Sequence, residues 1–293
     1  MLIVSDALIE GNKTLTLHPA LLPWHKKLEF RRRQWFSCKD KTPLEWYAAI
    51  VDASPAVLLA TQCSNIPVDT KQCWVASPYH SQLGRDQVRV IPEGLFPWCA
   101  EDAIWLCDVL NPLLGEEGMH LLRVGTALLL TCCDPMDAQP MSFARVSGKT
   151  LPNRHPEGSD GGRLMRLVSE IQMILHNNQP PHRSGQSEIN GLWIWGESVW
   201  PAAASEGMPT VATRNPFLQA VADGKDANMT ITEADRLPDL LKPEAPLPVH
   251  LLLAGEDYVV HLTKSYFNLF RHKTWDTSSV KDEEKLFAAL RRL

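Results

Sequence analysis

The sequence predicts an α/β protein built from two lobes. The first observation is a short apolar run at residues 192–195, which Gly191 and Gly196 bound on either side. Because it is too short for three helical turns, it predicts a buried strand. The second is an amphipathic helix over residues 162–178, directly upstream. The third is an order of strand, strand, helix, strand, strand over residues 73–133, typical of a compact α+β module.

Length and composition place the chain among globular proteins. Its 293 residues suffice for one large core or two smaller ones, and 44% of them are hydrophobic. The net charge of -5 argues against a nucleic-acid partner. No apolar run reaches the roughly 18–20 residues that cross a bilayer. The absence of such a run predicts no membrane partner. The seven cysteines show no framework spacing, so we expect reduced thiols and a cytoplasmic location.

The N-terminal quarter contains four predicted features. Residues 2–4 form a short strand. Residues 25–36 interleave basic and aromatic side chains, a pattern that can bind phosphates, although a helix with a solvated basic face suits an acidic protein better. A threonine cap, a proline and a glutamate predict a helix over 42–51. An apolar run at 56–60 follows.

The α+β module begins with a strand at residues 73–76, which Pro78 is expected to stop because proline cannot donate to a ladder. Helical spacing of apolar residues predicts a helix over 100–111, ended by Pro112. Three further apolar runs predict strands, at residues 88–91, 119–124 and 126–133.

The C-terminal half contains the central unit. Residues 134–160 are rich in Pro and Gly and predict a loop, and the helix at 162–178 then leads to the strand at 192–195. In an open α/β sheet, ligands bind at the carboxyl ends of strands, and Gly196 permits a sharp turn there. Beyond it we predict strands at 249–254 and 258–261 and helices at 217–222 and 281–293.

The common catalytic motifs are absent from the sequence. There is no Cys-x-x-Cys and no His-Glu-x-x-His, so a structural zinc or zincin site lacks support. The glycine-rich segment 158–163 lacks the Lys-Ser/Thr of a phosphate-binding loop, and no Gly-x-Ser-x-Gly elbow occurs. The sequence therefore names no catalytic residue.

One longer pattern resembles a known family. A helix ending in Leu175-His176-Asn177-Asn178 leads through a loop to Asn190, two residues, a Trp-rich strand and a glycine. With the segments 75–80 and 106–119, this pattern is similar to the bacterial Rpf-E type regulatory proteins. That family is related to cofactor-independent phosphoglycerate mutases of the archaeal type. The resemblance covers roughly residues 73–201.

The resemblance implies an alkaline-phosphatase-like or phosphoglycerate-mutase-like α/β core with an inserted α+β lobe. Its expected parts are residues 1–72 and 187–293 for the core and residues 73–186 for the lobe. Active members hold two divalent metals through Asp and His ligands and pass phosphate through a serine or similar nucleophile.

The metal ligands are the part of this pattern that the sequence matches least. Asp6, Asp257 and His261 are the nearest candidates, whereas a two-metal centre needs five or six ligands. We therefore expect no cofactor. The alternative is a divalent metal such as Mn or Zn.

The resemblance also implies a ligand-binding cleft at the end of the 192–195 strand. Its candidate residues come from the strand and from the inserted lobe: Asn190, Trp193, Trp195, Gly196, His80, Arg154 and His155. An arginine with backbone donors suits a phosphate or carboxylate. The alternatives are that the tryptophans pack the core, that Asn190 bonds its own turn, and that the basic residues are ordinary surface.

The expected function is that of a phosphoglycerate-mutase-like protein without its metal centre, acting as a binding or regulatory module for a small anionic ligand. The alternative is a divergent metal-dependent phosphotransferase or phosphatase acting on a phosphorylated small molecule. A third hypothesis is a structural protein that binds partners through exposed tryptophans. The sequence names no protein partner.

Overall fold

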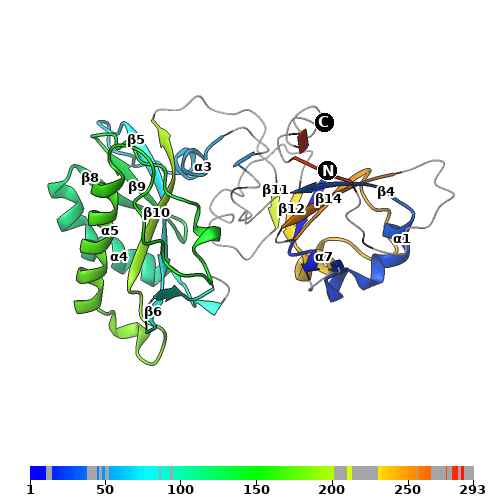
Figure 1. Ribbon diagram of the computed structural model, residues 1–293, viewed down its shortest axis with the longest axis horizontal. Helices are drawn as coiled ribbons and strands as arrows, with labels where there is room; N and C mark the ends of the chain where they lie inside the picture. The colour runs from blue at the N-terminus through cyan, green and yellow to red at the C-terminus, as the bar shows by residue number, and fades with distance from the viewer. Residues whose placement is uncertain are drawn as a thin grey trace. The chain divides into compact units, whose positions relative to one another are not determined.

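The computed structural model describes residues 1–10, 15–37, 45, 48–49, 53–85, 87–92, 95–200, 210–212, 230–255, 257–264, 275, 279–282 and 285–286. The chain divides into two compact units, which are Met1–Asp52 with Ser205–Leu293, and Ala53–Ala204 (Figure 1). Both units combine strands with helices, which confirms the predicted α/β class. No helix in the described ranges is long and apolar enough to span a membrane.

The first unit is built on a seven-stranded sheet. Its strands lie in the order β11 (Thr210–Ala212), β12 (Thr230–Glu233), β1 (Leu2–Ser5), β13 (His250–Ala254), β14 (Tyr258–Thr263), β4 (Arg32–Ser37) and β15 (Val280–Lys281). β1 runs parallel to both of its neighbours, and all four of its residues are buried. The strands predicted at 2–4, 249–254 and 258–261 are therefore confirmed.

Short helices cover one face of this sheet. The buried core there joins β1, β13 and β14 to the 3-10 helix η1 (Pro19–Trp24) and to the helices that follow it. The other elements among the described residues of this unit include the hairpin of β2 (Leu8–Glu10) and β3 (Leu15–Leu17), η5 (Ala234–Arg236) and α7 (Leu237–Leu240).

The expectation of one basic helix over residues 25–36 is wrong. Helix α1 (His25–Glu29) is short, and the chain then enters β4, which pairs with β14. Between them the buried Arg31 donates to the backbone oxygens of Leu247 and Pro248. Trp35 and Phe36 are both buried. Consecutive residues point to opposite faces of a strand, so a strand buries both aromatics where one helical face would not.

The second unit is built on a four-stranded antiparallel sheet. Its strands lie in the order β10 (Gly191–Val199), β5 (Gln72–Tyr79), β9 (Ala127–Cys132) and β8 (Met119–Val124). Helices α4 (Ala100–Glu116) and α5 (Gly161–Asn177) share one buried core with this sheet (Figure 1). Helix α3 (Pro55–Thr61) contacts β5, β9 and β10.

Two prolines do not end their elements, contrary to our expectation. Helix α4 continues through Pro112 because the residue is exposed, while Leu110 and Leu114 on the opposite side are buried. Strand β5 continues through Pro78, which pairs with Leu192 of β10. Pairing of β5 with β9 stops at Ala76, so the proline lies where β5 has only one paired neighbour.

The central strand was predicted correctly, but its setting was not. β10 is antiparallel to β5, so the rule for the carboxyl ends of parallel strands does not apply to it. Gly196 lies inside β10, with a φ of 66°, where the register with β5 shifts between Trp195 and Ser198. The glycine therefore forms a bulge rather than the expected turn, because pairing resumes at Ser198.

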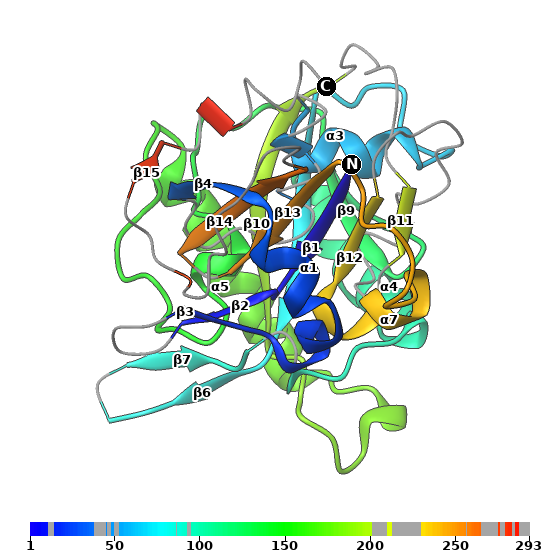
Figure 2. The same ribbon diagram turned by 90° about the vertical axis from the view of Figure 1, so that its right-hand side faces the viewer.

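A small hairpin extends the second unit. β6 (Ser81–Leu83) pairs with β7 (Val88–Val90) and forms a two-stranded arm (Figure 2). Two backbone bonds, from Val90 N to Lys149 O and from Leu151 N to Val88 O, attach residues 149–151 to the other side of β7. The loop predicted at 134–160 also contains η3 (Phe143–Arg145).

The units differ from the expected parts of the chain. The expected lobe ran from 73 to 186, whereas the second unit is Ala53–Ala204. It includes α3, which packs on β5, and β10, whose pairing partner is β5 rather than a core strand. The helices predicted at 42–51, 217–222 and 281–293 lie largely or wholly outside the described residues.

Candidate functional site

Asn190, the first candidate for the anion cleft, holds the base of the β6–β7 hairpin. Its side-chain Oδ1 accepts from Ser81 N at 2.7 Å and from Ser81 Oγ at 3.2 Å. Its Nδ2 donates to Ser81 O at 2.8 Å. Both ends of the amide thus bind one residue of β6. This geometry makes Asn190 a positioning residue for the hairpin.

The two central tryptophans are buried with satisfied indole groups. Trp193 is 2% exposed and donates to Met141 O at 2.8 Å. Trp195 is 3% exposed and donates to Ser77 Oγ at 2.9 Å. This arrangement supports the core-packing alternative for both rings.

The basic candidates lie along the hairpin and the segment beside it. His80 precedes β6, and its Nδ1 lies 2.9 Å from Glu188 O. Arg154 and His155 are exposed and follow the segment 149–151, which pairs with β7. Arg89 of β7 is exposed, and its Nε donates to Gly148 O at 3.3 Å.

Cationic side chains are concentrated in this part of the chain. Residues 138–156 include Arg145, Lys149 and Arg154 but no Asp or Glu, although the whole protein carries a net charge of -5. We call residues 138–156 together with β7 the basic segment. All three cations and Arg89 are exposed. A surface of this composition attracts anions at low ionic strength.

The predicted metal ligands of the first unit are not brought together. Asp6 follows β1, and Asp257 lies in the turn between β13 and β14. His261 lies four residues further along β14, about 13 Å from Asp257 at the usual rise of a strand. Its Nε2 is 3.1 Å from Nδ1 of His250. Within the described ranges, these three side chains do not converge on a common point. Among the described residues, Asp6, Asp257 and His261 therefore do not form a joint metal-ligand set.

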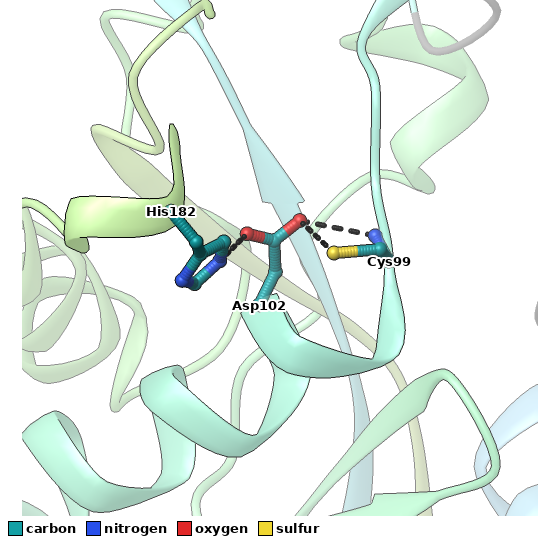
Figure 3. Close-up of side chains that lie close together, drawn as sticks. All are labelled: Cys99, Asp102 and His182. Atoms are coloured by element: carbon teal, nitrogen blue, oxygen red, sulfur yellow. Dashed lines mark hydrogen bonds and ion pairs between the residues drawn. The ribbon is translucent and has the colours of Figure 1, made fainter. Parts of the chain in front are cut away.

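A different set of ionisable side chains does converge, at the start of α4 (Figure 3). Cys99 is the cap residue before α4, Asp102 lies in its first turn, and His182 belongs to η4 (Pro181–Arg183). One ligand atom from each of these side chains lies within 4.8 Å of the other two. In the part of the chain that the structure describes, this is the one such group of three His, Cys, Asp or Glu residues.

The Asp102 carboxylate is the centre of this cluster. It is 1% exposed and accepts from His182 Nε2 at 2.8 Å through Oδ1. Through Oδ2 it accepts from Cys99 N at 3.0 Å and from the Cys99 thiol at 3.2 Å. Arg183 Nη1 lies 2.6 Å from the same Oδ2 and forms a buried ion pair.

Arg183 fixes the loop that brings His182 to α4. It is 4% exposed and donates to Pro97 O and, through two nitrogens, to Ser187 O. Its guanidinium also lies 5.0 Å from the ring centre of Phe96. The loop after α5 and the segment before α4 are thereby held together.

The electrostatics of the cluster favour the thiol form of Cys99. Partial desolvation raises the pKa of this thiol, a backbone hydrogen bond opposes that rise, and the side-chain hydrogen bond to the Asp102 carboxylate adds to it. Backbone hydrogen bonding and the bond from Cys99 lower the pKa of the neighbouring Glu101 carboxyl.

Sequence reasoning missed this cluster. Cys99 and Asp102 stand three residues apart at a helix start, which is the spacing of a capping box, and this signal was available. At His182 and Arg183 the sequence predicts only a connecting loop. Their approach to Asp102 spans about 80 residues of sequence, so no local pattern revealed it.

The comparisons with known proteins concern the fold of the whole chain. No family model and no curated protein matches this sequence. Two solved structures align with 99% of the chain. One is the PH0037 protein from Pyrococcus horikoshii, with 10% identity, 96% of its own chain covered and a TM-score of 0.49. The other is the cofactor-independent phosphoglycerate mutase from Thermoplasma acidophilum, with 12% identity, 98% of its own chain covered and a TM-score of 0.36.

Proposed function

We propose that this chain is a phosphoglycerate-mutase-like protein of the Rpf-E regulatory type, which binds a small phosphate or carboxylate anion without a working two-metal centre. The observation that carries the proposal is the basic segment. It exposes Arg89, Arg145, Lys149 and Arg154 on an acidic protein, and no Asp or Glu occurs in residues 138–156.

The way the segment is held supports a defined surface rather than scattered charges. Arg89 and Thr150 form an isolated antiparallel bridge, so the backbone segment that carries Lys149 lies beside β7. Asn190 in turn fixes the hairpin through three hydrogen bonds to Ser81. The backbone that carries these cations is therefore fixed before an anion binds, which lowers the ordering cost of binding.

The arrangement of the predicted metal ligands also supports a binding role over a two-metal reaction. His261 is 8% exposed and contacts His250, and it lies along β14 from Asp257 rather than beside it. Two-metal catalysis requires ligands that converge on ions about 3.5–4 Å apart. The described residues of the first unit offer no such set of three.

Thermal unfolding at low ionic strength tests the anion-binding role. Phosphate and 3-phosphoglycerate at millimolar concentration should raise the melting temperature, because a ligand that binds only the folded state stabilises it. The double variant Lys149→Ala, Arg154→Ala should lose this rise. Arg166→Ala, an exposed arginine on α5, is the matched control and should keep it.

Two outcomes contradict the proposal. One is that neither anion shifts the melt of the wild-type protein. The other is that the shift persists in the double variant, which would place the anion elsewhere.

The second candidate function is a metal-dependent phosphatase, and one structural observation favours it. β1 and β13 are parallel neighbours, and Ala7 N donates to Ala254 O. Asp6 and the turn with Asp257 therefore lie at the same end of the sheet, where α/β proteins bind ligands. Hydrolysis of a phosphomonoester that requires added Mn²⁺ and is lost in Asp6→Asn would favour this candidate over the binding role.

A further inference from the structure

The cluster at the start of α4 contains the donor set of a transition-metal site. Cys99 offers a sulfur, His182 an imidazole nitrogen and Asp102 a carboxylate oxygen, all within 4.8 Å of one another. Sulfur and nitrogen ligands favour zinc-like cations, whereas Mg²⁺ and Ca²⁺ prefer oxygen. From these contacts we propose that Cys99, Asp102 and His182 bind one divalent cation of the zinc class.

The spacing of the three atoms fits such an ion. With bond lengths of about 2.0–2.3 Å, two ligands of a tetrahedral zinc stand roughly 3.3–3.6 Å apart. Nε2 of His182 is 2.8 Å from Oδ1 of Asp102, and Sγ of Cys99 is 3.2 Å from Oδ2. These two pairs of atoms therefore need to separate by less than about 1 Å to admit the ion, and all three ligand atoms already lie within 4.8 Å of one another.

The hydrogen bonds of Asp102 leave room for a metal on one oxygen. Oδ2 accepts three bonds, from Cys99 N, the Cys99 thiol and Arg183. Oδ1 accepts one, from His182. When the imidazole takes the neutral tautomer that is protonated on Nδ1 and the thiol releases its proton to solvent, the ion takes the place of the two hydrogen-bonded protons. Cys99 N and Arg183 remain on Oδ2 and orient the carboxylate, as outer partners do in metal sites.

The solvent exposure and the charge of the three side chains also suit a bound cation. The His182 side chain is 37% exposed and Cys99 is exposed, so an ion reaches them from solvent, while Asp102 closes the inner side. Thiolate and carboxylate together contribute two negative charges, which equal the charge of the divalent ion, while the Arg183 cation stays paired with Asp102. Three protein ligands leave a fourth position for water or another ligand.

This site is separate from the basic segment and from Asp6, Asp257 and His261. It does not depend on the anion-binding proposal. It also differs from the sequence expectation of no cofactor.

The test uses the purified full chain after treatment with a chelator. Calorimetric titration with Zn²⁺ should give one equivalent per chain. Substitution with Co²⁺ should give the near-ultraviolet charge-transfer absorption of a cobalt–thiolate bond. Cys99→Ser should abolish that absorption, and both Cys99→Ser and His182→Ala should weaken zinc binding at least tenfold.

The controls use side chains of the same types outside the cluster. Cys63→Ser replaces a partly exposed thiol, and His176→Ala replaces an exposed histidine on α5. Both should bind zinc like the wild type. Circular dichroism must show that each variant is folded. If Cys99→Ser does not fold, zinc binding by His182→Ala still tests the site, because His182 is exposed.

Absence of zinc binding at micromolar concentration overturns the proposal. Binding that both Cys99→Ser and His182→Ala retain also overturns it, because the ion then sits elsewhere. When the thermal unfolding with anions is repeated in the presence of chelator, no metal is bound, so any rise in melting temperature tests the anion-binding proposal only. Failure of one proposal is therefore distinguishable from failure of the other.

Discussion

Arg183 and Asp102 form a buried ion pair with Nη1 and Oδ2 2.6 Å apart, although 81 residues separate them in the sequence. Both side chains are at least 97% buried. Removing one partner of such a pair leaves an uncompensated charge in a medium of low dielectric constant. The pair therefore makes the start of α4 and the loop after α5 depend on each other.

Asp102→Ala should lower the free energy of unfolding by about 3–5 kcal/mol, because Arg183 then stays buried without its carboxylate. Urea denaturation measures the change. Asp108→Ala, at an exposed position of the same helix, should cost less than about 1 kcal/mol. Equal losses in the two variants would mean that the ion pair contributes little.

A double-mutant cycle isolates the pair. The variant Asp102→Leu, Arg183→Met should lose less stability than the sum of its two single variants, by about 0.5–3 kcal/mol. Strict additivity would show that the two side chains act independently.

Gly196→Val should destabilise the second unit by about 1–3 kcal/mol. The backbone has a φ of 66° there, and an added Cβ would lie 3.2 Å from Cβ of Pro55. Gly196→Asn should cost less, because asparagine tolerates the left-handed region. A melting temperature that is unchanged by valine would remove the case for strain at this bulge.

Gly191→Ala should also destabilise the second unit, by about 1–3 kcal/mol. A Cβ at this position would overlap the buried ring of Tyr79, whose hydroxyl binds Gln172. Gly162→Ala is the matched control. It lies in the first turn of α5 with open space around its Cβ position, so it should be neutral or stabilising by up to about 1 kcal/mol. If the two substitutions behave alike, close approach to Tyr79 is not what selects glycine at 191.

The stability of the first unit should fall as the pH drops from about 6.5 to about 4. Burial and the adjacent His250 lower the pKa of His261 from 6.5 to about 4. In this window the unfolded chain binds a proton that the folded protein excludes, so unfolding is favoured progressively. The loss should be on the order of 2 kcal/mol.

Chemical denaturation at a series of pH values measures this dependence. His261→Gln should flatten the curve between pH 6.5 and 4, whereas the exposed His176→Gln should not. An identical slope in His261→Gln would assign the pH dependence to other groups.

Much of the local structure was predictable from the sequence. Buried strands such as residues 2–4 and 192–195 follow from short apolar runs, and α5 follows from apolar residues at helical spacing. These signals are local, because each depends on the period with which side chains alternate between core and solvent. The positive φ of Gly196 was likewise predictable, since glycine adopts that conformation without strain.

The pairing of strands was decided only by the tertiary structure. Nothing in the run at 192–195 specifies that β10 lies antiparallel to β5, so its expected role at the end of a parallel strand was wrong. The predictions that Pro112 ends its helix and that Pro78 ends its strand were wrong for the same reason. Whether a missing N–H is costly depends on which neighbour faces it, and neighbours are set by the fold.

The candidate sites also differ in whether the sequence or the tertiary structure reveals them. The sequence alone identified Arg154 and His155 as basic candidates, because charge is a property of the sequence. The meeting of His182 with Cys99 and Asp102 was not predictable. It requires the loop after α5 to return to the start of α4, and long-range packing with the buried Arg183 holds it there.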